Sequence, residues 1–84
     1  MKHIQVSTHA MTIPPFNIRD NTDIETAVAK RLRGGLYFGA FRLESWTGDG
    51  TQQTYSGTLC RGAGNVVCGI SVYVRHPHPN NTPA

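Results

Sequence analysis

The chain has 84 residues, of which 38% are hydrophobic, and it carries a formal net charge of +3 at pH 7. This length leaves room for one domain with one small core, and the basic balance excludes a protein that imitates DNA by covering itself with acidic groups. Because the sequence shows neither a signal-peptide pattern nor an apolar run of about 18 residues, we expect a cytoplasmic protein that makes no membrane contact.

The N-terminal part is predicted to form one strand and an irregular edge segment. Residues 2–8 alternate, with Ile4 and Val6 pointing inward and polar side chains pointing outward, which is typical of a half-buried strand. Residues 12–18 contain two adjacent prolines, which cannot lie in a central strand. We therefore expect a turn or an edge segment there, with its apolar residues tucked under a helix.

The next segment carries clear helix signals. Thr22 is a good N-cap, and Glu25, three residues later, completes a capping box. Lys30, Arg31 and Arg33 are expected in the last turns, where cations interact favourably with the helix dipole. The glycine pair that follows supplies the stop. The apolar stripe that should lie on the sheet consists of Ile24, Ala27, Val28 and Leu32.

Residues 36–75 are predicted to form a three-stranded antiparallel meander, because the registers of two hairpins agree with each other. A turn at 48–50 sets the first register and the next glycine turn sets the second. The resulting pairs include Gly39 with Leu59, Leu43 with Tyr55, and Tyr55 with Val72. A shift of one residue in either hairpin would divide the apolar side chains between the two faces of the sheet, so the pattern selects this register. One face collects Phe41, Leu43, Tyr55, Leu59, Cys68, Ile70 and Val72.

The predicted fold class is α+β, with one helix packed on a small antiparallel sheet in the order β-(β)-α-β-β-β. Residues 1–76 form a single domain. The chain from His76 onward is rich in proline and lacks packing residues, so residues 77–84 are expected to be a disordered tail. Because Cys60 and Cys68 fall on opposite faces in the preferred register, we expect two free thiols.

No catalytic or cofactor-binding constellation is predicted. The acidic residues are spread over caps, turns and one strand, where Glu44 is expected to form an ordinary surface ion pair with Arg42. Structural zinc sites usually hold their ligands in closely spaced pairs, but seven residues separate the two cysteines, which point to opposite faces, and the two histidines lie on the predicted tail. The four residues are Cys60, Cys68, His76 and His78. We therefore expect no enzyme activity, no metal and no cofactor.

The outer face of the predicted sheet carries the candidate partner-binding residues. They are Phe38, Arg42, Trp46, Tyr73 and Arg75. Exposed apolar patches mark contacts, and aromatic and arginine side chains often anchor protein interfaces. The same residue types also stack on bases and hold phosphates. Alternatively, the first strand, the tail or a homodimer mate covers this face. Lys30, Arg31 and Arg33 are candidates at a second, basic edge, together with Arg61.

In its size and in the order of a capped helix and a meander over residues 22–74, the chain resembles small phage-encoded anti-CRISPR proteins that act on type I surveillance complexes. The resemblance implies a non-enzymatic inhibitor that binds this host ribonucleoprotein complex and blocks recognition of target DNA by occlusion. These proteins share no signature motif, so no functional residue is carried over. Two alternatives stay open: a small basic nucleic-acid-binding module or regulator, and a self-assembling structural subunit.

Overall fold

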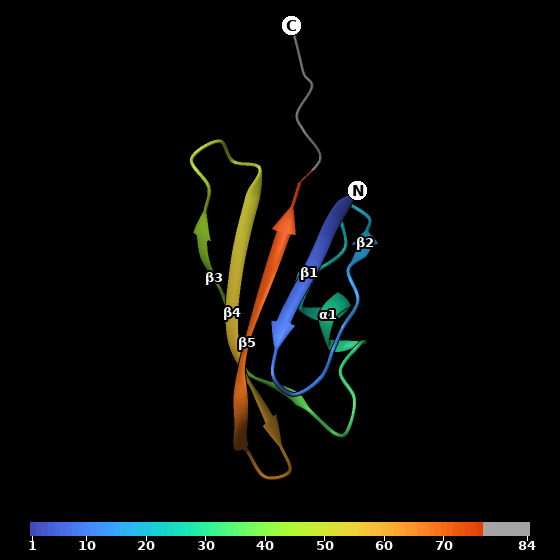
Figure 1. Cartoon of the computed structure of the whole chain (residues 1–84), viewed down its shortest axis with the longest axis vertical. Helices are drawn as coiled ribbons and strands as arrows, with labels where there is room; N and C mark the ends of the chain where they lie inside the picture. The colour runs from blue at the N-terminus through green and yellow to red at the C-terminus, as the bar shows by residue number, and fades with distance from the viewer. Residues whose placement is uncertain (77–84) are drawn as a thin grey trace, which may run out of the picture.

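The computed structural model describes residues 1–76, which form one antiparallel sheet of five strands and one short helix (Figure 1). The strands are β1 (Lys2–Thr8), β2 (Phe16–Ile18), β3 (Tyr37–Trp46), β4 (Gln52–Arg61) and β5 (Asn65–Arg75), and the helix is α1 (Ile24–Ala29). The strands lie in the order β2-β1-β5-β4-β3, so β2 and β3 are the edges. The predicted tail, residues 77–84, lies outside the described residues.

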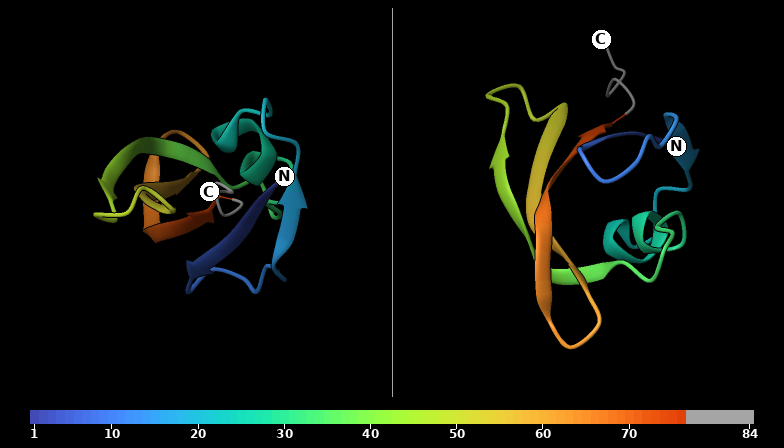
Figure 2. Two further views of the ribbon diagram at one scale, coloured as in Figure 1. Left: turned by 90° about the horizontal axis from the view of Figure 1, so that it is seen from above. Right: turned by 60° about the horizontal axis from the view of Figure 1, so that its bottom comes forward.

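The predicted α+β class holds only in outline. The fold is mostly β, its helix has six residues, and the N-terminal strands join the meander in a single sheet. This sheet curls, and α1 lies on its concave side between the two edge strands (Figure 2). Within the described part of the chain, no helix is long and apolar enough to cross a membrane.

The core lies on the concave face of the curled sheet, against α1. Its buried members are Ile4, Ile24, Val28, Leu36, Leu59, Ile70, Val72 and Val74. The alternation in β1 is confirmed, because Ile4 is fully buried opposite Val74 and the neighbouring positions are exposed. The helix stripe is also confirmed, since Ile24 and Val28 are in the core and Leu32 packs against it. β2 pairs with β1 as a three-residue edge strand, which agrees with its preceding prolines.

The N-cap of α1 is Asp23, so the predicted capping box at Thr22 is wrong. The Asp23 carboxylate accepts hydrogen bonds from the backbone N–H of Thr26 at 3.0 Å and from its hydroxyl at 2.9 Å. These two bonds lower the pKa of Asp23. A charged acceptor forms stronger hydrogen bonds than a hydroxyl, which explains why the aspartate takes the cap position.

The helix also ends earlier than its sequence signals indicate. Its last residue is Ala29, so the predicted cations Lys30, Arg31 and Arg33 follow the helix instead of occupying its final turns. The helix ends in a tighter turn of the 3₁₀ type, because the N–H of Arg31 donates to the carbonyl of Val28, three residues back, at 2.9 Å. The glycine pair at 34–35, with φ of 70° and 76°, turns the chain into β3.

The centre of the predicted meander register is confirmed. Leu43 lies opposite Tyr55, and Tyr55 lies opposite Val72. Leu59 lies opposite Cys68, as expected. The thiols of both cysteines are free, in agreement with the prediction, but Cys60, which the predicted register turned to the outer face, is buried beside a register shift in β4.

The ends of β3 depart from the predicted register because the strand contains two β-bulges. One lies between Phe38 and Ala40, and the other between Leu43 and Ser45. Each bulge adds one residue to β3 relative to β4, which reverses the face occupied by the residues beyond it. The predicted pairing of residue 39 with residue 59 is therefore wrong: Phe38 takes that position.

Two glycines allow β3 and β4 to approach closely at the first bulge. A Cβ atom at Gly39 would collide with the thiol of Cys60, and a Cβ atom at Gly57 would collide with the carbonyl oxygen of Ala40. A side chain at Gly57 would push the two strands apart, and one at Gly39 would displace the side chains of Cys60 and Thr58. The absence of a side chain at Gly39 and Gly57 thus permits the irregular register.

Candidate binding surfaces

The predicted binding residues occupy three separate places rather than one face. The bulges move Phe38 and Trp46 to the concave face, where they lie opposite Leu59 and the buried Gln53. The expectation that they share the outer face is therefore wrong. The convex face keeps Arg42, Tyr73 and Arg75, whose partners on β4 are Ser56, Thr54 and Gln52. The loop after α1 holds Lys30, Arg31 and Arg33.

Aromatic side chains gather on the concave face along β3 and β4. We refer to Phe38, Phe41, Leu43, Trp46, Tyr55 and His76 as the aromatic surface. The ring of Phe41 lies between two others: its centroid is 4.7 Å from that of Phe38, with a tilt of 34°, and 5.2 Å from that of Tyr55, nearly parallel at 6°. Aromatic pairs of this kind contribute about 0.5–1.5 kcal/mol beyond their burial. The three rings therefore form a stable row that joins the two strands.

The end of the aromatic surface near the β3–β4 turn is uncovered. Trp46 is 49% exposed and Leu43 is 42% exposed, although both belong to the concave face. A helix of six residues is about 9 Å long, whereas a strand of ten residues spans about 33 Å. In Figure 1 α1 lies at about mid-height of the sheet, and the end of the hairpin that carries the β3–β4 turn extends well beyond it.

A buried amide on β4, opposite Trp46, supports this uncovered end. Gln53 is only 7% exposed; its Nε2 donates to the hydroxyl of Tyr55 at 3.3 Å, and its Oε1 lies 2.5 Å from Nε2 of His76. The amide oxygen is an acceptor, so His76 donates from Nε2. Burial lowers the pKa of His76, which favours the neutral ring. His76 was expected to begin a tail without packing, yet it stacks on Trp46.

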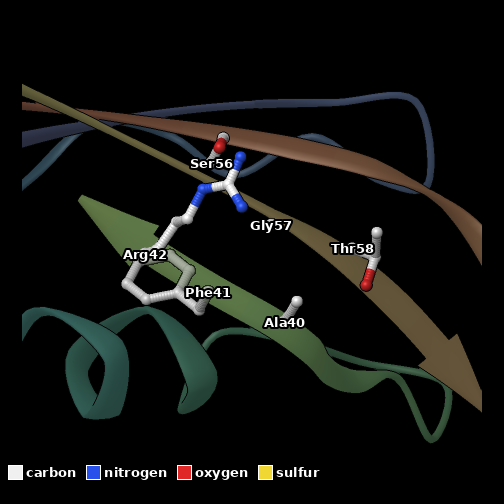
Figure 3. A pocket seen from close by; sticks show the side chains of 6 residues that line it. All are labelled: Ala40, Phe41, Arg42, Ser56, Gly57 and Thr58. Atoms are coloured by element: carbon white, nitrogen blue, oxygen red, sulfur yellow. The ribbon is translucent and has the colours of Figure 1, made fainter. Parts of the chain in front are cut away.

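A shallow hollow of about 290 Å³ lies between β3 and β4 and is lined by residues of both faces (Figure 3). Its lining residues are Ala40, Phe41, Arg42, Ser56, Gly57 and Thr58. The Nε of Arg42 donates to Glu44 at 3.3 Å, and the hydroxyl of Ser56 donates to the same carboxylate oxygen at 2.9 Å. The bond from Ser56, followed by that from Arg42, lowers the pKa of Glu44. The predicted ion pair of Arg42 and Glu44 is thus present, and it ties Arg42 to its own strand.

A second hollow, of about 280 Å³, lies beside the loop after α1, and we refer to it as the basic hollow. Its lining residues are Thr12, Ile13, Pro14, Pro15, Phe16, Lys30, Arg31 and Arg33. The guanidinium carbon of Arg31 is 3.7 Å from the centre of the Phe16 ring, a cation–π contact. Arg61, expected at the same basic edge, instead donates to the carbonyl of Gly34 at 2.9 Å.

Sequence reasoning placed Phe41, Leu43 and Tyr55 on the apolar core face, and this is correct for Phe41 and Tyr55, which pack against the core. It did not predict that Leu43 stays exposed or that His76, assigned to the tail, stacks on Trp46. Alternation along the strands places the first three residues on the apolar face, but it does not tell how far the helix covers that face. The ten-residue length of the hairpin strands was the available signal, because only a much longer helix would cover them.

Among residues 1–76, no three His, Cys, Asp or Glu side chains gather where they could hold a metal ion. No family model, curated protein or solved structure matches the chain. The interpretation of these surfaces therefore depends on their own geometry and chemistry.

Proposed function

We propose that this chain is a non-enzymatic binding protein that inhibits a host machine by occlusion, with the aromatic surface as its contact. The observation that carries the proposal is the half-exposed Trp46 beside the half-exposed Leu43. Exposed apolar groups that lie together mark interaction sites, and tryptophan is among the residue types that most often anchor interfaces.

The contacts around Trp46 suit it to this role. Its ring is stacked on His76, which is hydrogen-bonded to the buried Gln53, so the indole is held in place before a partner arrives. A preordered side chain loses less conformational freedom on binding, which leaves more of the contact energy for affinity. The row from Phe41 to Tyr55 extends the apolar surface toward the core.

The target we propose is a type I CRISPR surveillance complex. This choice is supported by the resemblance in size and element order, and the net charge of +3 favours an acidic partner surface. A chain of 84 residues acts on such an assembly by covering the surface that inspects DNA. Truncation of an interface anchor should then cost on the order of 2 kcal/mol or more of binding free energy.

The proposal is tested by capture of the purified surveillance complex on the tagged protein, with and without nuclease. The informative variant is Leu43→Ala/Trp46→Ala, which removes the exposed end of the aromatic surface. The matched control is Tyr73→Ala/Arg75→Ala, which removes exposed side chains from the convex face. Circular dichroism and thermal unfolding establish that both variants keep the fold.

We expect the complex to be captured despite nuclease, to be lost with the concave-face variant and to be retained with the control. Capture that disappears on nuclease treatment would contradict a protein contact. Equal capture by both variants would remove the aromatic surface from the interface. Failure of the unmodified protein to capture the complex would overturn the proposed target.

The open edge of β3 favours a second candidate, the self-assembling subunit. Within the part of the chain that the structure describes, β3 has a neighbour on one side only. Edge strands present unpaired backbone groups that can pair with a second copy. The two bulges interrupt this edge, which is a common device against such pairing. Light scattering over a range of concentrations distinguishes the candidates, because a self-assembling subunit would grow in mass and an occluding monomer would not.

A further inference from the structure

We propose that the basic hollow is a phosphate-binding site for the backbone of a single-stranded nucleic acid. Lys30, Arg31 and Arg33 bring three cations to one rim of this hollow. A neighbouring hollow of about 210 Å³ shares Lys30 and Arg31 with it. The two hollows thus lie on either side of the same two cations. An extended chain of anionic groups needs a groove that is continuous in this way.

The guanidinium of Arg31 is positioned before any ligand binds. It lies over the ring of Phe16, with its carbon 3.7 Å from the ring centre, and Phe16 is in turn held in β2, opposite Ile4 of β1. A stacked guanidinium keeps its N–H groups pointing outward in one plane, which is the geometry that two phosphate oxygens accept. The contact therefore reduces the entropy that Arg31 would lose on binding phosphate.

The positive charge of the basic hollow is not balanced from within the described chain. The ion pairs found among residues 1–76 do not include Lys30, Arg31 or Arg33, and all three side chains are exposed. Acidic residues occur near the opposite end of α1, where Asp23 is engaged as the N-cap. Clustered cations that lack carboxylate partners raise the local concentration of anions.

The walls of the basic hollow favour a nucleic acid over an acidic peptide. Pro14 and Pro15 are exposed in the wall, and Thr12 adds a hydroxyl group. A nucleotide presents a charged phosphate next to a flat base, so its phosphate can meet the cations while the base packs on the proline rings. Proteins that bind single strands generally combine a basic groove with apolar side chains on which the bases pack, usually aromatic ones, and the exposed prolines offer such an apolar surface here. An acidic peptide would interact with the cations but would leave the apolar wall of the hollow without a partner.

The test is a titration of the isotope-labelled full chain with a short oligothymidylate, followed by NMR. We expect amide shifts confined to residues 12–18 and 22–33. Three phosphate contacts predict that log affinity falls against log salt with a slope of about −2. The Lys30→Gln/Arg33→Gln variant preserves the stacking of Arg31 on Phe16, and its slope should fall to about −0.7.

The matched control is Arg42→Gln/Arg75→Gln, which removes the same charge from the convex face and should leave the shifts and the slope unchanged. If the control variant weakened oligonucleotide binding equally, the effect would come from net charge alone, and the proposed site would be wrong. The proposal also fails if polyglutamate produces the same shifts with the same affinity, or if the shifts fall elsewhere. The result does not depend on the surveillance complex, because the isolated chain is titrated.

Discussion

The indole of Trp46 stacks on the imidazole of His76, with ring centroids 5.2 Å apart and planes 17° from parallel. The contact joins the end of β3 to the residue that follows β5, across the intervening strand β4. Gln53 of β4 is buried beneath it and is hydrogen-bonded to His76. The most exposed part of the aromatic surface is thus held by a contact between residues 30 positions apart in sequence.

Protonation of His76 should be visible in the fluorescence of Trp46, the single tryptophan of the chain. A protonated imidazole quenches a stacked indole, so emission should fall on acidification. Burial lowers the pKa of His76 from its ordinary 6.5, and the midpoint should therefore lie below that value. Since the folded state favours the neutral ring, stability should also decrease as pH falls from 6.5 through the folded pKa. The measurement is emission against pH.

The matched variants for this titration are His76→Gln and His3→Gln. The first should abolish the transition, and the second should preserve it because His3 lies on the convex side of β1. A midpoint at or above 6.5 would contradict the burial of the His76 ring.

Acid should weaken the β3–β4 turn through Asp49. Its carboxylate accepts hydrogen bonds from the hydroxyls of Thr47 and Thr51, both at 2.7 Å, and from the Thr51 backbone N–H at 3.1 Å. These bonds lower the pKa of Asp49 from its ordinary 3.8 to about 2. The stabilisation is therefore present above 3.8 and is lost as pH falls toward 2. Urea unfolding should show a smaller loss in this range for Asp49→Asn; identical pH profiles would argue against the turn contacts.

Gly57→Ala should destabilise the fold because the new methyl group would meet the backbone carbonyl of Ala40. The collision is with main chain, so relief requires β3 to move away from β4. Such overpacking typically costs about 1–3 kcal/mol. Gly48→Ala is the control, because nothing lies within 4 Å of the added carbon. Chemical denaturation measures both; a neutral Gly57→Ala would show that the bulged register is not tightly packed.

Two leucines of the predicted apolar face should behave in opposite ways. Leu59→Ala empties a fully buried position and should cost about 2–5 kcal/mol of unfolding free energy. Leu43→Ala changes a 42% exposed side chain and should cost well under half as much, yet it should weaken partner capture. Thermal unfolding and capture separate the two effects. Equal destabilisation would mean that the concave face is covered at Leu43.

Local patterns predicted the parts of the fold that depend on local chemistry. The alternation of apolar and polar residues indicated β1 and the centre of the meander, since a period of two assigns each side chain to a face within a few residues. Turn glycines located the ends of the hairpins. The apolar stripe of the helix was also predicted correctly. The capping-box pattern, however, selected Thr22 as the N-cap, whereas the structure has Asp23 there.

By itself, the sequence determined which segments are strands, the register at the centre of the meander and most of the apolar face. The tertiary structure alone decided on which side Phe38 and Trp46 lie and which apolar residues stay uncovered. The physical reason differs for the two features. The first bulge depends on how closely Gly39 and Gly57 approach residues of the opposite strand. The exposure of the apolar residues depends on which part of the long hairpin the short helix covers. Both are contacts between residues distant in sequence, which no local period records.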